Sequence, residues 1–364
     1  MLRFSCSRLL RNVRFQVLRQ KSTSVSLHSR RIPHIIEPRL LLGTATATTL
    51  YVFYLWFFDD DKPPPEYPNS FLAVVHRRLP SNAYSHFVGL VADTNVPSVL
   101  RPFVFGACAK FMKYDMTEAK ESDLRKYATF GQLFNRELAP GVRPIDTKAL
   151  INSPADGTVV HIGPVESEKG LLEQVKGITF SMAEFLGPTD GLLRKKSGRL
   201  YQCIIYLSPS DYHRFHAPAD WIVEIRRHFP GKLLSVRPSF IKNLPGVFVL
   251  NERVVYLGEW KHGFMSLTAV GAAGVGSVVA ADNIDPTLST NRSTSALERH
   301  EPGQHFEEIS LGRVNSPLGT PFGQFKLGST IVLVFEAPAE GYVWSVQPGD
   351  RIKYGAALMA PSSP

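Results

Sequence analysis

The stretch Phe325-Lys326-Leu327-Gly328-Ser329-Thr330-Ile331-Val332-Leu333-Val334-Phe335, close to the C-terminus, is the one on which the expected fold and chemistry of this chain depend. Its apolar, β-branched second half predicts a buried strand, and Gly328 marks a turn before it. The Gly328-Ser329 step also places a hydroxyl nucleophile beside a carbonyl that no neighbouring side chain shields. The step is therefore either a plain strand opening or a point at which the chain cleaves itself.

Self-cleavage would begin with attack of the Ser329 hydroxyl on the carbonyl of Gly328, which moves the acyl group from nitrogen to oxygen and leaves an ester. Elimination of that ester, followed by hydrolysis, would leave a pyruvoyl group at a new N-terminus. This ketone is an electrophile that none of the twenty side chains supplies. Short motifs match by chance, so the hypothesis depends on what the rest of the chain provides.

After Pro144 the sequence is typical of a mainly antiparallel β body, because short apolar runs alternate with Gly and Pro. Strands are predicted over residues 157–162, 200–207, 221–225, 247–256, 264–269, 277–280, 330–335 and 342–346. One short helix, 180–186, is expected among them. The polar segment 284–306 is expected to be a loop.

Two separate stretches of this body, 153–160 and 346–358, are similar to the two halves of a barrel-sandwich domain of the lipoyl or biotinyl kind. Pro348-Gly349 suits a type II turn, in which Gly takes the positive φ. The pattern allows a non-catalytic carrier or binding module. No lysine occupies a tight hairpin between the halves, however, as a carrier would need.

The first 39 residues contain nine Lys or Arg and one acid, Glu37, with apolar residues interleaved. This composition is typical of a mitochondrial transit peptide, and a basic disordered tail is the alternative. The formal charge of the whole chain is +9, so residues 40–364 carry a net charge of only +1. No basic face is expected on the folded part, which argues against a nucleic-acid partner.

Residues 40–58 carry no charge and predict a transmembrane helix, which would be roughly 28 Å long. A buried core helix is the alternative. Arg31 and Arg39 precede this segment and three aspartates, 59–61, follow it. The positive-inside tendency then places the leader in the matrix and the body in the intermembrane space of a mitochondrion, with the inner membrane between them.

A Pro-rich linker, 59–68, separates this span from the predicted body, 69–364. Amphipathic helices are predicted at 71–78, 98–113 and 122–138. The second mixes Phe with Lys, so it could rest on a lipid surface or pack as an ordinary helix. The expected fold class is therefore α+β: a mainly antiparallel β body with barrel-sandwich-like halves, preceded by a transmembrane helix and several N-terminal amphipathic helices.

The cysteines Cys6, Cys108 and Cys203 are odd in number and widely scattered. They form neither a disulfide framework nor a zinc-binding spacing. Cys108 and Cys203 are therefore predicted to be buried thiols.

A serine hydroxyl is a poor nucleophile in water, so self-cleavage needs a base and a group that orients the base. The densest histidine cluster is Asp211-Tyr212-His213-Arg214-Phe215-His216-Ala217-Pro218. Asp156, at the mouth of a strand, is either a turn residue or the third member of an Asp, His, Ser set. No companion ligand gives the two histidines a recognised metal-binding spacing, so no metal is expected.

Four motifs together resemble the phosphatidylserine decarboxylase family, and the leader and span resemble its mitochondrial form. The similarity covers roughly residues 70 to 360. The motifs are Ser-Pro-Ala-Asp-Gly (153–157), Val-Lys-Gly-Ile-Thr-Phe-Ser-Met-Ala-Glu-Phe-Leu-Gly (175–187), Tyr-Leu-Ser-Pro-Ser-Asp-Tyr-His-Arg-Phe-His-Ala-Pro (206–218) and Phe-Lys-Leu-Gly-Ser-Thr-Ile-Val-Leu-Val-Phe-Glu-Ala-Pro (325–338).

The resemblance implies that Asp156, His216 and Ser329 form the self-processing triad and that His213 acts in decarboxylation. It implies a cut between Gly328 and Ser329 that yields a membrane-bound β subunit and an α subunit, 329–364, held together noncovalently.

The implied reaction converts phosphatidylserine into phosphatidylethanolamine and CO2. A covalent pyruvoyl group made from Ser329 would form a Schiff base with the substrate amine and accept the electron pair. By the same resemblance, Val175–Gly187 would lie at a lipid-facing substrate pocket.

One departure lies just before the cleavage site, where the family has a Lys-Gly pair and this chain has Asn315-Ser316-Pro317-Leu318-Gly319-Thr320-Pro321-Phe322-Gly323-Gln324. It leaves the contacts of the 284–324 region open. Two other functions stay as alternatives: an Asp, His, Ser ester hydrolase, which lacks the Gly-x-Ser-x-Gly elbow at Ser329, and a non-catalytic membrane-anchored module.

Overall fold

The computed structural model describes residues 81–165, 170–175, 178–189, 191–192, 198–242, 244–272, 278–288, 290 and 306–362. The chain divides into two compact units, 1–62 and 63–364, and all described residues belong to the second. The predicted leader, membrane span, linker and helix 71–78 lie outside the described residues and stay predictions. Within the part that is described, no helix has the length and apolarity needed to cross a bilayer.

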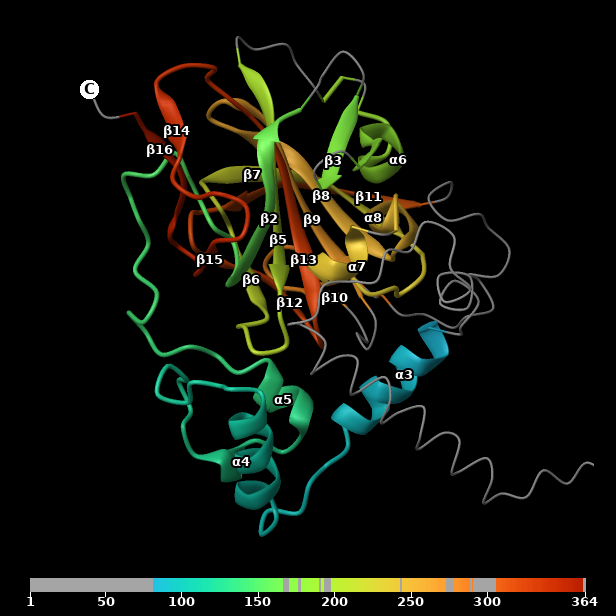
Figure 1. Cartoon of the computed structure of the whole chain (residues 1–364), viewed down its shortest axis with the longest axis vertical. Coiled ribbons are helices and arrows are strands. Elements are labelled where there is room, and N and C mark those ends of the chain that lie inside the picture. The colour runs from blue at the N-terminus through green and yellow to red at the C-terminus, as the bar shows by residue number, and fades with distance from the viewer. Residues whose placement is uncertain are drawn as a thin grey trace, which may run out of the picture. The chain divides into compact units, whose positions relative to one another are not determined.

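An eight-stranded antiparallel sheet forms the centre of this unit (Figure 1). Its strands lie in the order β11-β7-β8-β9-β13-β5-β2-β15. Their bounds are β2 (Gly157–Pro164), β5 (Arg199–Leu207), β7 (Trp221–Phe229), β8 (Arg253–Trp260), β9 (Gly263–Gly271), β11 (Glu307–Ser316), β13 (Ser329–Ala337) and β15 (Arg351–Ile352). The predicted antiparallel β body is confirmed.

Three smaller antiparallel sheets accompany the large one. They are β1 (Ile151–Asn152) with β16 (Ala357–Pro361) and β14 (Tyr342–Trp344); β10 (Val278–Ala280) with β12 (Pro321–Phe325) and β6 (Arg214–His216); and β3 (Leu171–Val175) with β4 (Ile178–Ser181). The two stretches compared with barrel-sandwich halves pair with one another, since β15 pairs with β2.

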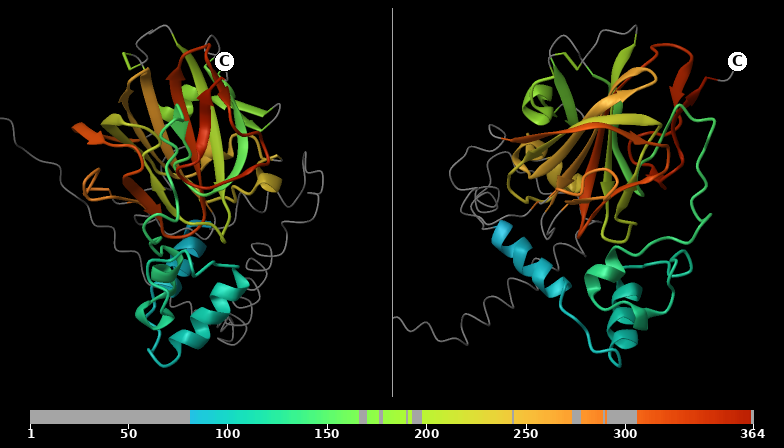
Figure 2. Two further views of the ribbon diagram at one scale, coloured as in Figure 1. Left: turned by 90° about the vertical axis from the view of Figure 1, so that its left-hand side faces the viewer. Right: turned by 180° about the vertical axis from the view of Figure 1, so that it is seen from behind.

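The described helices are short. They are α3 (Ser81–Ala92), α4 (Arg101–Phe111), the 3₁₀ turn η1 (Leu124–Lys126), α5 (Phe130–Phe134), α6 (Met182–Leu186), α7 (Pro238–Ile241) and α8 (Val247–Leu250). Helix α4 confirms the centre of the helix predicted at 98–113. Two further views show the twist of the large sheet beside these elements (Figure 2).

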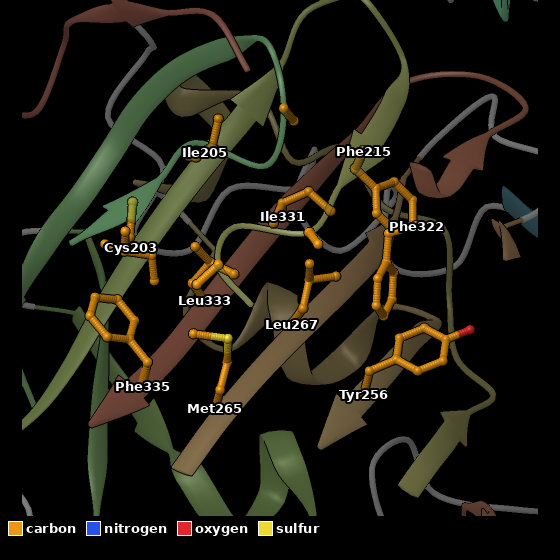
Figure 3. Packing of buried hydrophobic residues seen from close by; sticks show 14 of the residues in the cluster. Cys203, Ile205, Phe215, Tyr256, Met265, Leu267, Phe322, Ile331, Leu333 and Phe335 are labelled. Carbon is orange, nitrogen blue, oxygen red and sulfur yellow. The ribbon is translucent and has the colours of Figure 1, made fainter. Parts of the chain in front are cut away.

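Strand β13 is buried along its whole length, from Ser329 to Ala337. It pairs with β5 on one side and β9 on the other. Alternate side chains of β13, Ile331, Leu333 and Phe335, enter one apolar core together with residues from both neighbours (Figure 3). Burial of each such side chain stabilises the fold by about 1.5–3 kcal/mol, which explains why this run of sequence forms the central strand.

Cys203 lies in the same core and is a free, buried thiol, as predicted. Cys108 is also free but only half-buried. Burial raises the pKa of both thiols.

The single helix predicted at 122–138 is wrong. Asp123 caps the short η1 turn, and Thr129 starts a new helix by accepting a hydrogen bond from the backbone of Gln132. Side chains of this kind compete with a continuous helix for backbone donors. Leu138 then forms a β-bridge with Ala119.

The strand predicted at 247–256 is wrong in its first half, where α8 forms before β8. Gly246 takes a positive φ of 74° ahead of α8. Asn251 then ends the helix, because its side chain hydrogen-bonds the backbone of Leu234 and Gly271. In the helix predicted at 180–186, Phe180 belongs instead to β4.

The 284–324 region contains more regular structure than the sequence predicts. Residues 307–316 form β11 along β7, and 321–325 form β12 along β6. Within the predicted loop 284–306, residues 289 and 291–305 lie outside the described part of the chain.

Candidate active site

Ser329 is the first residue of β13 and pairs with Leu207 on β5 and Gly271 on β9. It is only 1% exposed, and its Oγ is buried without a hydrogen-bond partner. A buried hydroxyl without a partner costs about 1–3 kcal/mol. Thr330 on the same strand and Ser266 and Thr268 on β9 share this feature, so the feature alone does not distinguish a plain strand opening from a cleavage site.

The chain on both sides of the Gly328-Ser329 step is attached to the strands that flank the histidine cluster. Before the step, Gln324 on β12 pairs with Arg214 on β6, and the Phe325 backbone N–H donates to the carbonyl of His213 at 2.9 Å. After the step, β13 pairs with β5, which ends at Leu207. The connection 208–213 therefore lies beside the connection 326–328, and the proposed cut falls at the end of the latter.

His213 is fully buried in this connection. Its Nδ1 lies 2.9 Å from the carbonyl of Asp211, so Nδ1 carries the proton and donates it. The other nitrogen, Nε2, is buried and has no hydrogen-bond partner among the described residues. The ring packs on Phe134 with centroids 4.1 Å apart, and burial lowers the pKa of His213 to about 3. The imidazole is therefore neutral at pH 7.

His216 lies on β6 and is also buried. Its Nδ1 donates to the carbonyl of Gly319 at 3.0 Å, and its Nε2 lies 3.2 Å from the Tyr212 hydroxyl, which donates to it. The ring stacks on Tyr354 with centroids 3.9 Å apart and planes 4° apart. Burial lowers the pKa of His216 to about 4. Gly319 belongs to the stretch that departs from the family pattern, so that departure reaches the site.

Asp156 is buried at the start of β2, where Arg143 binds both carboxylate oxygens at 3.2 and 2.7 Å. The backbone N–H of Tyr354 donates to the same carboxylate at 2.8 Å. Asp156 therefore holds the residue whose ring stacks on His216. The described hydrogen bonds of Asp156 do not include His216, and neither imidazole bonds to Ser329. Asp156 and His216 therefore both contact Tyr354. Ser329 pairs with Leu207, at the opposite end of the connection 208–213 from His213.

Asp211 fixes the path of the connection 208–213. Its carboxylate accepts a hydrogen bond from the Ser208 backbone N–H at 2.7 Å and a second from the guanidinium of Arg351 on β15. Burial raises the pKa of this carboxyl group. Arg351 thus connects the histidine cluster to the C-terminal part of the chain.

Several residues of the site were missed by sequence reasoning, namely Phe134, Arg143, Tyr212, Gly319, Arg351 and Tyr354. Tyr212 stands inside the histidine motif and could have been singled out there. The others carry no signal of their own, because each reaches the site through contacts between segments that are far apart in the sequence. No group of three potential metal ligands occurs among the described residues.

The described residues of the segment 175–187 are not among those that line the cavity beside α5 described below. The segment follows β3, where the Glu173 backbone N–H donates to the side chain of Gln202. Gln202 pairs with Val334, which is five residues into β13 and so roughly 17 Å from Ser329 along the strand. The expected role of this segment at a substrate pocket stays a prediction.

A cavity of about 650 Å³, here called the α5 pocket, lies between α5, β6 and β12. Five of its lining residues are cationic and three are acidic. The lining residues are Asp93, Lys120, Glu121, Lys126, Tyr127, Gly131, Gln132, Asn135, Arg136, Glu137, Arg214, Gln324 and Lys326. Arg214 directly follows His213 in the sequence, so the pocket adjoins the histidine cluster.

The family model described as "Phosphatidylserine decarboxylase" matches residues 130–360 of this chain. The chain is 40% identical over 329 residues to the mitochondrial phosphatidylserine decarboxylase proenzyme of Caenorhabditis elegans, covering 88% of this chain and 81% of that protein.

Identity is 36% to the proenzyme of the same name from Rattus norvegicus, with 81% and 76% covered, and 34% to mitochondrial proenzyme 1 of Saccharomyces cerevisiae, with 80% and 74% covered. The family model spans the histidine cluster, Asp156 and the Gly328-Ser329 step, and the chain therefore belongs to the phosphatidylserine decarboxylase family.

Proposed function

We propose that this chain converts phosphatidylserine into phosphatidylethanolamine and CO2 with an electrophile that it makes by splitting itself between Gly328 and Ser329. The observation that carries the proposal is the position of Ser329: a buried hydroxyl directly after a glycine, at the start of the central strand and paired with Leu207, where the connection 208–213 to the histidine cluster begins. The family assignment supports the overall reaction.

The residues around Ser329 fit a pyruvoyl group made from it. The β5 and β9 ladders hold the backbone of Ser329 from both sides, so a new N-terminus there would stay in place after the cut. No described partner holds the Oγ that has to be eliminated. When formed, the pyruvoyl ketone supplies an electron sink for decarboxylation.

For self-processing we assign Ser329 as the nucleophile, His216 as the base that takes its proton and Asp156 as the residue that positions His216. The described contacts suggest that Asp156 acts through Tyr354, whose backbone it binds and whose ring stacks on His216. Both imidazoles are neutral at pH 7 because burial lowers their pKa values, and a base must be neutral to accept a proton.

For decarboxylation we assign His213 as the residue that handles the substrate proton. Burial keeps the pKa of His213 near 3, so its imidazole is neutral before a substrate binds. A substrate carboxylate arriving beside its free Nε2 would raise that pKa. His213 would then hold a proton in the complex and return it to the α-carbon of the substrate after CO2 leaves.

We further propose that the protein works on the mitochondrial inner membrane, with the span 40–58 as anchor and the body in the intermembrane space. The relatives are named mitochondrial, and their named substrate is a lipid. Helices α3 and α4 and the turn between them expose large apolar side chains: Phe87, Leu90, Val91, Val99, Leu100, Phe103 and Phe111. A surface of this kind suits contact with a bilayer.

The proposal is tested by the mass of the purified mature protein. Two fragments are expected, the smaller beginning at position 329 and blocked to Edman degradation. Ser329→Ala should leave one intact, inactive polypeptide, because the nucleophile is gone. Ser266→Ala is the matched control, since Ser266 is another buried, unpartnered hydroxyl in the same sheet but lies away from the cut. An intact chain that still decarboxylates phosphatidylserine would refute the proposal.

The two histidines are separated by measuring splitting and CO2 release in the same variants. His216→Ala should slow splitting, whereas His213→Ala should spare splitting and abolish CO2 release. Asp156→Asn should also slow splitting. The opposite pattern for the two histidines would reverse their assignment. His213 is the alternative base for splitting, because its Nε2 has no hydrogen-bond partner among the described residues and is able to accept a proton.

A further inference from the structure

Arg136, just after α5, is a buried cation that forms no ion pair within the described part of the chain, and the two carboxylates whose charges reach it, Asp156 and Glu118, are bound by Arg143. The residue is 5% exposed, and its Nε and Nη1 are buried without a hydrogen-bond partner in the described chain. The guanidinium lies 4.1 Å from the centroid of the Tyr114 ring. A cation–π contact offsets part of the desolvation cost but leaves the positive charge in place. A buried, unpaired charge is strongly unfavourable, so this position favours the arrival of an anion.

The other four cations of the α5 pocket differ from Arg136 because each has a carboxylate partner. The pairs are Lys120–Glu137 at 2.7 Å, Lys126–Glu121 at 2.6 Å, Arg214–Glu137 at 3.1 Å and Lys326–Asp93 at 3.2 Å. All three carboxylates that line the pocket are used in these pairs. The positive charge that remains for a ligand is therefore centred on Arg136.

The α5 pocket adjoins the residues assigned to the chemistry through a ring contact, a hydrogen bond and short stretches of chain. Phe134, two residues before Arg136, packs on His213 with ring centroids 4.1 Å apart. The Arg214 backbone continues directly from His213, and its Nε donates to the carbonyl of Asn135 at 3.0 Å. Lys326 on the pocket wall is three residues before Ser329. A ligand bound at Arg136 is thus beside the residues that we assign to the chemistry.

We propose that Arg136 binds the phosphodiester of the phospholipid headgroup, an inference that rests on the function proposed above. The planar guanidinium presents a fork of donors that matches two phosphate oxygens. Only an oxygen and a methylene separate the phosphorus of this headgroup from its α-carbon. A phosphate held in the α5 pocket would therefore direct the α-carbon and its carboxylate toward His213 and position 329.

The carboxylate of the substrate is a poorer partner for Arg136. Its negative charge must leave the carboxyl group during the reaction, so a guanidinium bound there would stabilise the ground state more than the transition state. The phosphodiester keeps its charge throughout. Binding it lowers the energies of both states equally, and loss of Arg136 should then raise KM and leave kcat nearly unchanged.

The test uses the full-length Ser329→Ala chain in detergent, so that binding is measured without any turnover. The probes are glycerophosphoserine, glycerophosphoethanolamine and free serine, titrated calorimetrically into this chain with and without Arg136→Gln. Arg136→Gln should weaken both phosphodiesters to a similar extent, by about ten- to a hundredfold, and leave free serine unaffected. Arg125→Gln is the matched control, because Arg125 is an exposed arginine paired with Asp123 outside the pocket.

In the processed enzyme, Arg136→Gln should split normally and raise KM for phosphatidylserine by a similar factor, with kcat within about threefold of the parent. Unchanged binding of glycerophosphoethanolamine would overturn the proposal. A selective loss of free serine, or a fall in kcat at constant KM, would show instead that Arg136 serves the carboxylate. If the chain does not decarboxylate at all, the glycerophosphoethanolamine titration still decides whether the phosphodiester site exists.

A purely structural role for Arg136 predicts a different result. Removal of an unpaired buried charge should leave the melting temperature of the ligand-free chain unchanged or raise it, whereas loss of a structural contact should lower it. Should Arg136→Gln fail to fold, the proposal is wrong in its present form. Arg136→Lys provides the second measurement, because it keeps the charge and loses the fork, and binding of both phosphodiesters should fall by a smaller factor.

Discussion

Two neutral, buried histidines are the main feature of this protein at the scale of single residues. Each donates its Nδ1 proton to a backbone carbonyl, of Asp211 for His213 and of Gly319 for His216, and each therefore presents Nε2 as a lone pair. Their tautomers are thus set by the backbone and not by a carboxylate. This arrangement differs from a triad in which the acid bonds the imidazole directly.

Burial of these histidines predicts a loss of stability in mild acid. In the unfolded chain an imidazole takes up a proton below about pH 6.5, whereas in the folded chain the pKa is about 3 for His213 and about 4 for His216. Between these values only the unfolded state gains protons, so the free energy of unfolding falls as the pH falls. The loss should be on the order of a few kcal/mol per histidine, complete below the folded pKa and absent above pH 6.5.

The measurement is the urea midpoint of the full-length Ser329→Ala chain at pH 7.5 and pH 5. His213→Gln and His216→Gln should each reduce the difference between the two midpoints, because glutamine does not titrate. If both variants keep the full difference of the parent, burial of these imidazoles is not the cause of the acid sensitivity.

At the scale of elements, helices α3 and α4 and the segment between them expose most of their large apolar side chains, although Phe105 on α4 is buried. Val99 is 88% exposed and Phe103 is 81% exposed. Arg101, between them, uses its guanidinium locally, on the backbone of Val96 and Arg125. The sequence alone could not decide between a lipid surface and ordinary helix packing, because an apolar stripe suits both. Exposure in the folded chain favours the lipid surface.

Phe103→Trp should place an indole in the lipid phase when the full chain is reconstituted into phospholipid vesicles, because burial of such a ring in hydrocarbon is worth about 1.5–3 kcal/mol. The added fluorescence should be quenched by lipids brominated on their acyl chains. Val343→Trp is the control, since Val343 is an exposed apolar residue on β14, outside the helices, at 53% exposure. Equal quenching of the two indoles would argue against docking through α4.

Prediction of elements succeeded where burial and pattern agree and failed where single side chains redirect the chain. The β13 run was predictable because continuous β-branched and aromatic residues suit a strand buried on both faces. The helix at 122–138 was not, because Asp123 and Thr129 each cap a new turn and override the helical spacing of the apolar residues. Strand β11 was missed because most of its residues are at least partly exposed and give no apolar run.

At the scale of the whole molecule, the proposed cut falls just before a C-terminal fragment that pairs with several strands of the rest of the chain. The fragment 329–364 contains β13, which is hydrogen-bonded along its length to β5 and along most of it to β9. It also contains β15, paired with β2, and β16, paired with β1. Loss of one peptide bond at Gly328 leaves all of these ladders intact.

The two fragments should therefore stay together after splitting without a covalent link. They are expected to elute as one species from a sizing column in mild detergent and to separate only in denaturant. Leu333→Ala, in the core of β13, should lower the denaturant midpoint of separation by an amount equivalent to about 2–5 kcal/mol. Val343→Ala, on the exposed β14, should change it little. Spontaneous separation of the parent fragments in mild detergent would contradict this account.

The sequence by itself determined the antiparallel class of the body, the central strand that begins at Ser329, and the set Asp156, His213, His216 and Ser329 as the candidate site. These features are local, since they depend on apolar pattern and on motifs of adjacent residues. Tertiary structure alone bound Asp156 to Arg143, placed Tyr354 between Asp156 and His216, and left Arg136 near His213 without an ion pair among the described residues. Such facts depend on which distant strands pair and on which charges find partners, and no single stretch of sequence contains that information.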